Sequence, residues 1–463
     1  MPKTVCRNPN NTAQIPMSRL QVVYQPITTI RPDPKNPRIH KPLQIQQISE
    51  SIRTFGFTVP VLVDGTGRII AGHGRVLAAE RLGLTEVPTI PLDHLTPEQA
   101  KAFMVADNRL AEIAIWDDQL LGEIFQELSG LDLDFRLDVT GFEMAEIDLK
   151  IEGLDEKKDG PDAADDIPEL PSPLPVSLLG DLWLLGKHRV LCGNALEGGC
   201  YRDLMNGRKA ALVFTDPPYN VPIEGHVGGH GQIHHRDFAM ACGEMSAGEF
   251  TDFLTKALSL AASHSKDGSL HYVCIDWRHV EELLAAGKSV FRELKNLCVW
   301  VKDNAGLGSF YRSQHELVLL FKKSNSPHQN NIQLGKFGRS RSNVWHFPGV
   351  NSFGRNTAEG NLLALHPTVK PVALIAEALM DSSGRGDLVL DPFLGSGSTL
   401  IAAERVGRLC YGLELDPLYV DTIIRRWEAW TGEDAVHAVS NKTFKDQEQA
   451  SLGTVPQEQG DAS

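Results

Sequence analysis

The fold is decided by the stretch Leu388-Val389-Leu390-Asp391-Pro392-Phe393-Leu394-Gly395-Ser396-Gly397-Ser398-Thr399. It predicts a buried strand, a glycine-rich turn and the start of a helix that continues through residues 400–404. In doubly wound sheets such a turn lies where nucleotide-like cofactors bind, and an acidic residue about 20 positions further on holds the ribose hydroxyls. Glu414 has that place, after the strand-like run 410–413. The same strand-turn-helix geometry can also bind a dinucleotide. Dinucleotide-binding turns favour Gly-x-Gly-x-x-Gly, however, and Leu400 stands where the last glycine would be.

A second motif, Asp216-Pro217-Pro218-Tyr219, follows the apolar run 211–214 and indicates chemistry on an amino group. The exocyclic amine of adenine or cytosine is a poor nucleophile, because its lone pair is delocalised into the ring. The Asp216 carboxylate and the Pro217 carbonyl would accept its hydrogens, and proline adds no competing N–H. Tyr219 would stack on a base rotated out of the duplex. The alternative is a strand-terminating turn with a solvated Asp216 and a packing Tyr219.

These motifs and their order resemble the amino-group DNA methyltransferases of the β class, over about residues 180–432. The match rests on residues 215–220, on His-Pro-Thr-Val-Lys-Pro at 366–371 and on residues 391–399. In this family the catalytic tetrad precedes the cofactor turn. An aspartate before Pro-Pro-Tyr goes with adenine N6, and a serine goes with cytosine N4. The resemblance therefore implies a site-specific enzyme that transfers a methyl group from S-adenosylmethionine to N6 of a flipped-out adenine in double-stranded DNA, with cytosine N4 as the alternative.

The same resemblance implies a set of cofactor contacts. S-adenosylmethionine would lie over the glycine turn, with Asp391 near its amino group and Glu414 on its ribose. Asn194 would contact the adenine end, although the family tends to have aspartate there. The implied cofactor-binding residues are Asn194, His366, Thr368, Lys370, Asp391, Phe393, Gly395, Gly397 and Glu414.

Three of these residues, His366, Thr368 and Lys370, precede a helix expected over residues 372–380. The N-terminal end of a helix offers free amides and a positive dipole end, which can receive the cofactor carboxylate. The alternative for Lys370 is an ordinary residue at a helix start.

The N-terminal part carries a separate signal. Short helical and strand-like segments alternate over residues 45–90, and the part from about 25 to 128 resembles ParB/sulfiredoxin-type domains. The turn Gly72-His73-Gly74-Arg75 is a candidate phosphate or nucleotide site, because helix-start amides and a guanidinium converge there. The alternative is a structural helix cap with Arg75 in a salt bridge. Sulfiredoxin chemistry is not expected, because it needs a cysteine in this turn and His73-Gly74 stands there instead. CTP-hydrolysing partition proteins have Gly-Glu-Arg-Arg in the corresponding place, and this chain lacks that Glu-Arg pair, so nucleotide hydrolysis stays open.

Length and composition agree with two folded parts, since 463 residues with 42% apolar content can support two cores. We expect an α/β fold: a Rossmann-like methyltransferase domain with a doubly wound, mostly parallel sheet, preceded by a small α+β ParB/sulfiredoxin-like domain. The expected ranges are 20–135 for the ParB-like domain, 136–175 for an acidic linker, 176–435 for the methyltransferase and 436–463 for a disordered tail. A non-catalytic ParB-like DNA-binding or partition regulator is the rival interpretation of the whole chain.

The formal charge of −14 is unusual for a protein that binds DNA, because affinity for DNA comes largely from phosphate neutralisation. Basic and aromatic residues gather, however, in a region of about 302–350, which is the expected target-recognition region. The alternative is a solvated basic loop. The candidate DNA-binding residues are Lys302, Arg312, Lys322, Lys323, Arg339 and Arg341.

Several function classes are not expected. The seven cysteines lack the spacing of a zinc site or a disulfide framework, and none neighbours a proline, as cytosine C5 methylation would require. The histidine- and glycine-rich loop 226–235 is expected to be a mobile lid and not a metal site. No apolar run approaches the ~18 residues of a membrane helix. We expect a cytoplasmic protein with no membrane partner, and a homodimer stays open.

Overall fold

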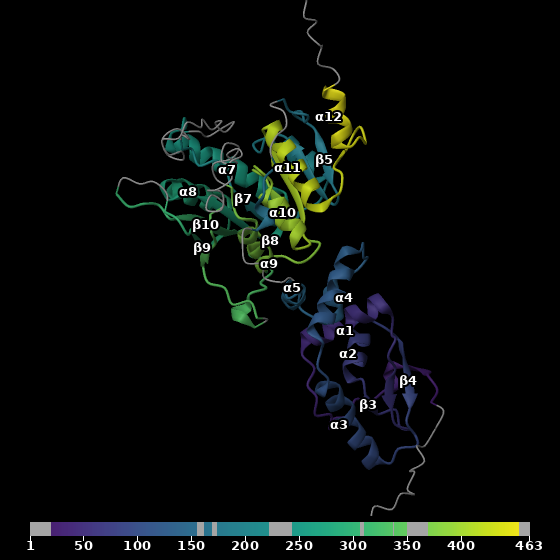
Figure 1. Ribbon diagram of the computed structural model, residues 1–463. Helices are drawn as coiled ribbons and strands as arrows, with labels where there is room; N and C mark the ends of the chain where they lie inside the picture. The colour runs from purple at the N-terminus through teal and green to yellow at the C-terminus, as the bar shows by residue number, and fades with distance from the viewer. Residues whose placement is uncertain are drawn as a thin grey trace, which may run out of the picture. The chain divides into compact units, whose positions relative to one another are not determined.

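The computed structural model describes residues 20–154, 162–168, 174–221, 243–305, 310–336, 338–349 and 369–452. The chain divides into two compact units, Met1–Glu143 and Met144–Ser463. Figure 1 labels elements of both units. No helix among these residues is both long and apolar enough to cross a membrane.

The first unit has a four-stranded sheet in the order β1-β4-β2-β3. Its core includes Val61, Ile69 and Val76, which are almost fully buried. Helix α3 begins at a capping box between Thr96 and Gln99, which satisfies amides that the helix start would leave free. The elements are β1 (Val23–Pro26), η1 (Ile27–Thr29), α1 (Pro42–Phe55), β2 (Val61–Val63), β3 (Ile69–Ala71), α2 (His73–Arg81), β4 (Glu86–Pro91), α3 (Pro97–Ile113), α4 (Asp118–Gly130) and η2 (Leu137–Thr140).

The second unit is built on a ten-stranded sheet in the order β11-β9-β10-β8-β7-β12-β13-β6-β5-β14. The five strands from β8 to β6 in this order run parallel, and one antiparallel strand follows on each side, β10 next to β8 and β5 next to β6. The strands are β5 (Leu182–Leu185), β6 (His188–Cys192), β7 (Ala210–Thr215), β8 (Ser265–Ile275), β9 (Glu293–Val301), β10 (His315–Lys322), β11 (Val344–His346), β12 (Leu388–Asp391), β13 (Leu409–Glu414) and β14 (Val436–His437).

Helices pack on both faces of this sheet. Alternate residues of one strand point to opposite faces, so Val389 joins the core under α9, α10 and α11, whereas Leu388 and Leu390 join the core under α6 and α7. The expected doubly wound α/β fold is confirmed. The helices are α5 (Met144–Glu152), η3 (Ala163–Asp165), α6 (Gly198–Met205), α7 (Ala247–Ser263), η4 (Trp277–His279), α8 (Val280–Val290), η5 (Gln333–Gly335), α9 (Val372–Ser382), α10 (Ser398–Arg405), α11 (Pro417–Thr431) and α12 (Phe444–Leu452).

The deciding stretch has the expected form of strand β12, a turn, helix α10 and then strand β13. Gly397 precedes α10 with φ +86°, a conformation that favours glycine. A Cβ there would lie 3.1 Å from Cγ1 of Ile423 in α11. A larger residue would therefore strain the turn in two ways.

The ends of the second unit differ from the expected boundaries. The range expected to be an acidic linker contains α5, in which Ile147 and Asp148 are fully buried. The range expected to be a disordered tail contains β14, which pairs with β5, and α12, whose Phe444 is buried against Trp183. Both segments order because they contact side chains far away in the sequence, so their local polar composition does not decide their structure.

Candidate active site

Four of the predicted catalytic and cofactor residues lie at one edge of the sheet. Asp216 follows β7, Asp391 ends β12, Glu414 ends β13 and Asn194 follows β6. These four strands are neighbours and run parallel, so their carboxyl ends meet. In open α/β sheets this is the edge that binds ligands.

The tetrad after β7 forms a fixed turn. Pro217 is buried and Pro218 is half-buried. The Tyr219 hydroxyl donates to Asp216 Oδ1 at 2.5 Å and lies 3.2 Å from Glu316 Oε2. Asn220, with φ +54°, accepts hydrogen bonds from the amides of Gly243 and Met245. The turn is thereby anchored to the start of the next described segment.

Lys370 lies in the catalytic half of the site. Its Nζ is 2.5 Å from Asp216 Oδ2, 2.9 Å from Glu316 Oε2 and 3.0 Å from the Tyr219 hydroxyl. The side chain is only 4% exposed, whereas that of Asp216 is 20% exposed. Lys370 was expected among the cofactor contacts, at the start of a helix whose N-terminal end receives the cofactor carboxylate. In the structure its ammonium group pairs with the carboxylate of Asp216 in the tetrad.

Glu316 was missed by the sequence reasoning. It lies in β10, and its Oε1 accepts from Lys302 Nζ at 2.5 Å while its Oε2 faces Lys370. The sequence does contain one indication of it. Glu316 directly precedes the apolar run 317–321, and an acid buried beside such a run needs a charged partner.

Burial and the two ammonium groups set the charges of this cluster. Burial raises the pKa of Asp216, Lys370 opposes that shift, and Glu316 adds to it. Burial would also raise the pKa of Glu316, but Lys370 and Lys302 bring it to about 2. Burial would lower the pKa of Lys370, and the two carboxylates raise it instead. Glu316 and Lys370 are thus charged at neutral pH, and Asp216 is the carboxylate that most readily takes up a proton.

The other half of the edge presents groups that suit a nucleoside. Glu414 accepts the Gly395 amide on Oε2 at 2.8 Å and the Asp416 amide on Oε1 at 2.9 Å. Burial raises its pKa to about 7. Phe393, which is half-buried, follows β12, and Asn194 follows β6, the two strands next to β13. A carboxylate, an aromatic ring and an amide fit the ribose and base of S-adenosylmethionine.

Asp391 holds the turn. It is 2% exposed, and its Oδ1 accepts the Phe393 amide at 3.0 Å. Burial raises its pKa to about 7. Asp391 therefore supports the turn on which Phe393 and Gly395 lie, and it offers little surface to a ligand.

Parts of the expected cofactor site lie outside the described residues, and another part contacts a side chain of the protein itself. His366, Thr368 and the loop 226–235 lie outside the described residues. Helix α9 begins close to the expected position, but the amide of Val372 donates to Asp165 Oδ1 at 2.7 Å. The helix start that was expected to receive the cofactor carboxylate thus has a carboxylate from the protein itself at this amide.

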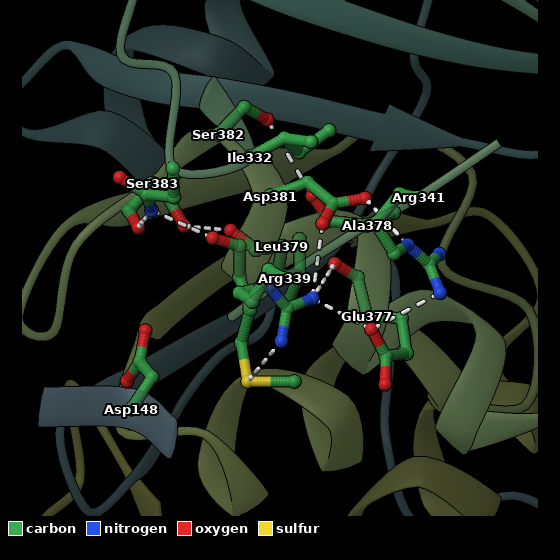
Figure 2. A network of polar contacts seen from close by, with 12 residues as sticks. Asp148, Ile332, Arg339, Arg341, Glu377, Ala378, Leu379, Asp381, Ser382 and Ser383 are labelled. Atoms are coloured by element: carbon green, nitrogen blue, oxygen red, sulfur yellow. Dashed lines mark hydrogen bonds and ion pairs between the residues drawn. The ribbon is translucent and has the colours of Figure 1, made fainter. Parts of the chain in front are cut away.

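The expected DNA-facing basic region needs correction. Arg339 is buried, and its Nη2 contacts Glu377 Oε2 at 2.6 Å and Asp381 Oδ1 at 2.9 Å, as Figure 2 shows. Arg341 pairs with the same two carboxylates. These arginines neutralise acids of α9 that are far away in the sequence, so they form no exposed basic face.

Three of the four lysines and arginines that remain of the expected set also differ from the expectation. Lys322 is buried, Lys323 donates to the Ser265 carbonyl, and Lys302 is paired with Glu316. Of the six candidates, Arg312 alone is classed as exposed.

The turn of the first unit brings its expected residues together. His73 Nε2 accepts the Asp33 amide at 3.2 Å, and Gly72 has φ +105°. A Cβ on Gly72 would lie 2.9 Å from Nη2 of Arg75, so the guanidinium packs against the turn. The Arg75 Nε is buried and has no hydrogen-bond partner in the part of the chain that the structure describes. Burial lowers the pKa of Arg75, and Asp107 opposes that shift.

Comparisons with known proteins identify the kinds of domain in the chain. A family described as DNA methylase (N6/N4 type) matches residues 210–425, the ParB N-terminal domain matches 11–108, and a ParB-methyltransferase HTH domain matches 119–178. The ParB-like nuclease domain-containing protein YnaK of Escherichia coli K12 is 51% identical over 81 residues, which are 18% of this chain and 93% of YnaK.

The methylase half has its own relatives. The type II methyltransferase M.HpaI of Haemophilus parainfluenzae is 22% identical over 263 residues, which cover 54% of this chain and 77% of M.HpaI. The solved structure of the PvuII DNA methyltransferase (cytosine-N4-specific) is 17% identical and covers 57% of this chain and 91% of that chain, with a TM-score of 0.39.

Fold and site together define a DNA methylase domain joined to a ParB-type domain. The chain carries an N6/N4 DNA methylase domain and a ParB N-terminal domain. The methyl donor of this family is S-adenosylmethionine.

Proposed function

We propose that this protein methylates the N6 amino group of adenine in double-stranded DNA. The observation that carries the proposal is the partly exposed Asp216 carboxylate at the carboxyl end of β7, held on one oxygen by Tyr219 and on the other by Lys370. Each carboxylate oxygen has two lone pairs, so both oxygens keep an acceptor position for the hydrogens of an amine.

S-adenosylmethionine supplies an electrophilic methyl group when it is bound. The residues that would hold it are Glu414 at the ribose, Phe393 against the base and Asn194 at the adenine edge. On the substrate side, Asp216 accepts a hydrogen bond from the adenine amine and takes up the proton that N6 loses. Its pKa, raised by burial, favours that transfer. Tyr219 fixes the carboxylate and presents its ring to the base.

The choice of adenine rests on Asp216 itself. The β-class resemblance associates an aspartate before Pro-Pro-Tyr with adenine N6 and a serine with cytosine N4. An ionised acceptor also binds an amine hydrogen more strongly than a neutral hydroxyl does. Cytosine N4 methylation remains the alternative that the experiment has to distinguish.

The test is mass spectrometry of nucleosides from unmethylated DNA incubated with the protein and S-adenosylmethionine labelled on its methyl group. Labelled N6-methyladenine is the expected product. Labelled N4-methylcytosine would overturn the adenine assignment, and the absence of label on any DNA would favour a non-catalytic regulator.

We also propose that the turn Gly72-His73-Gly74-Arg75 binds the phosphate of a nucleotide or of DNA. The supporting observation is the Arg75 guanidinium, which packs on the Gly72 turn at the start of α2 and has a buried Nε with no partner among the described residues. A phosphate would satisfy such a donor, and the α2 N-terminus would favour its charge.

Calorimetric titration with a panel of nucleoside triphosphates and with a short duplex tests this second proposal. Arg75→Ala should abolish the binding that the wild type shows. Arg81→Ala is the matched control, because Arg81 is exposed on the same helix. Equal affinities of the two variants would remove Arg75 from this role.

A further inference from the structure

We propose that Glu316 is a positioning residue that keeps Asp216 a good proton acceptor by sharing the charge of Lys370. This inference rests on the proposed role of Asp216 in methyl transfer. Glu316 does not contact the reacting amine. It acts through Lys370, and Lys302 holds it in place.

The geometry shows a shared ammonium. Lys370 Nζ has three N–H groups and three oxygen neighbours, which belong to Asp216, Glu316 and Tyr219 at 2.5, 2.9 and 3.0 Å. All its hydrogens are therefore engaged, and only one of them points at Asp216. Without Glu316, Asp216 would be the sole carboxylate balancing a buried cation, since Lys370 is 4% exposed.

Lys302 completes the arrangement from the outer side. It binds the Glu316 oxygen that Lys370 does not use, at 2.5 Å, and it is 30% exposed. Two ammonium groups thus face two carboxylates in the order Lys302, Glu316, Lys370, Asp216. Asp216, at the end of this row, is next to the positive charge of Lys370. The negative charge of Glu316 on the other side of Lys370 weakens the effect of that positive charge on Asp216.

The other groups around Asp216 come from several elements. Tyr219 faces it from the same turn, Cys274 from β8 and Asp391 from β12. The anion at Glu316 raises the pKa of Asp216, and the cation at Lys370 lowers it. Removing the Glu316 charge should therefore lower the pKa of Asp216 and make it a weaker base.

The test compares pH profiles of kcat for methyl transfer to DNA. In Glu316→Gln, which keeps the shape, the acid limb should move to lower pH by about one unit, and kcat should fall about tenfold at neutral pH. The KM for S-adenosylmethionine should stay unchanged. In Lys302→Met the acid limb should move the opposite way, because Glu316 then draws Lys370 from Asp216.

A double-variant comparison shows whether Glu316 acts through Lys370. In a Lys370→Met background, adding Glu316→Gln should have a smaller effect on kcat than it has in the wild type, because only the direct repulsion between the two carboxylates then remains. Glu281→Gln, an exposed glutamate of α8, is the matched control and should leave the profile unchanged. A purely structural role of Glu316 would lower activity without shifting the acid limb, and that result would overturn the proposal.

A second readout does not need turnover. The side-chain carboxyl of Asp216 can be titrated by 13C NMR in the free protein and assigned with Asp216→Asn. A lower Asp216 pKa in Glu316→Gln supports the inference even if the labelled product shows that adenine is not the substrate, and an unchanged pKa overturns it. If Glu316→Gln does not fold, the opposite shift expected in Lys302→Met decides the question in the same way.

Discussion

Arg408 and Asp148 form a buried ion pair across 260 positions of the sequence. Arg408 Nη2 lies 2.7 Å from Asp148 Oδ2, its Nη1 lies 2.9 Å from Oδ1, and both side chains have no exposed surface. Arg385 adds a third contact to the same carboxylate at 3.0 Å. This pair fixes α5, which was expected to be linker, to the start of β13.

Asp148→Ala should destabilise the protein strongly, because it leaves two arginines near an empty site in the interior. Loss of one partner of a buried pair typically costs about 3–5 kcal/mol. Thermal unfolding followed by circular dichroism measures the effect. The control is Asp203→Ala, since Asp203 is exposed on α6. Similar melting temperatures for the two variants would show that α5 is not fixed by this pair.

Gly397→Ala should weaken both folding and cofactor binding. The positive φ and the contact with Ile423 together cost about 1–3 kcal/mol for a residue with a Cβ. The matched control is Gly248→Ala in α7, where a Cβ meets nothing within 4 Å. That change should be neutral or slightly stabilising, because alanine favours a helix. Chemical denaturation and calorimetric titration with S-adenosylmethionine would follow the two properties.

Asp216→Ala should abolish methyl transfer and leave S-adenosylmethionine binding largely intact. Loss of a positioned general base alone typically reduces the rate about 10²–10⁴-fold. Single-turnover rates and binding constants of the same preparation separate the two effects. Turnover close to that of the wild type would remove Asp216 from the proposed chemistry.

Binding of S-adenosylmethionine should weaken as the pH falls through about 7. The pKa of Glu414 is raised by burial to about 7, so acidification converts the carboxylate that would hold the ribose into a neutral acid. In Glu414→Gln the affinity should be low at all pH values and should lose most of this dependence. Calorimetric titrations with S-adenosylmethionine from about pH 6 to about pH 8, roughly one unit on either side of this pKa, measure the pH dependence of the affinity. Burial also raises the pKa of Asp391 to about 7. If the affinity of Glu414→Gln still depends on pH in this range, Asp391 is the group responsible.

Arg75→Ala should leave methylation of short duplexes nearly unchanged, because the proposed phosphate site belongs to the other compact unit. Initial rates at saturating S-adenosylmethionine test this expectation, with Arg81→Ala measured in parallel. A complete loss of methylation in Arg75→Ala alone would show that the two units are coupled in catalysis.

The strand, turn and helix over residues 388–404 could be predicted because their signals are local. An apolar strand, a turn with Gly397 and a helix are written in one continuous stretch, and Glu414 follows at the spacing that such a unit sets. The tetrad Asp216 to Tyr219 is equally compact. Local backbone preferences and the alternation of apolar residues determine these elements, and the same elements are present in the folded protein.

Only the tertiary structure decided which charges meet. Lys370 lies 154 positions from Asp216, and Glu316 lies 97 positions from Tyr219, so no spacing in the sequence indicates their contact. For the same reason Arg339 was expected on a DNA-facing surface but is buried against Asp381. A buried charge needs a partner, and the order of strands in the sheet determines which partner it has. The sequence by itself therefore determined the fold class and the tetrad, whereas packing between distant elements decided the electrostatics of the site.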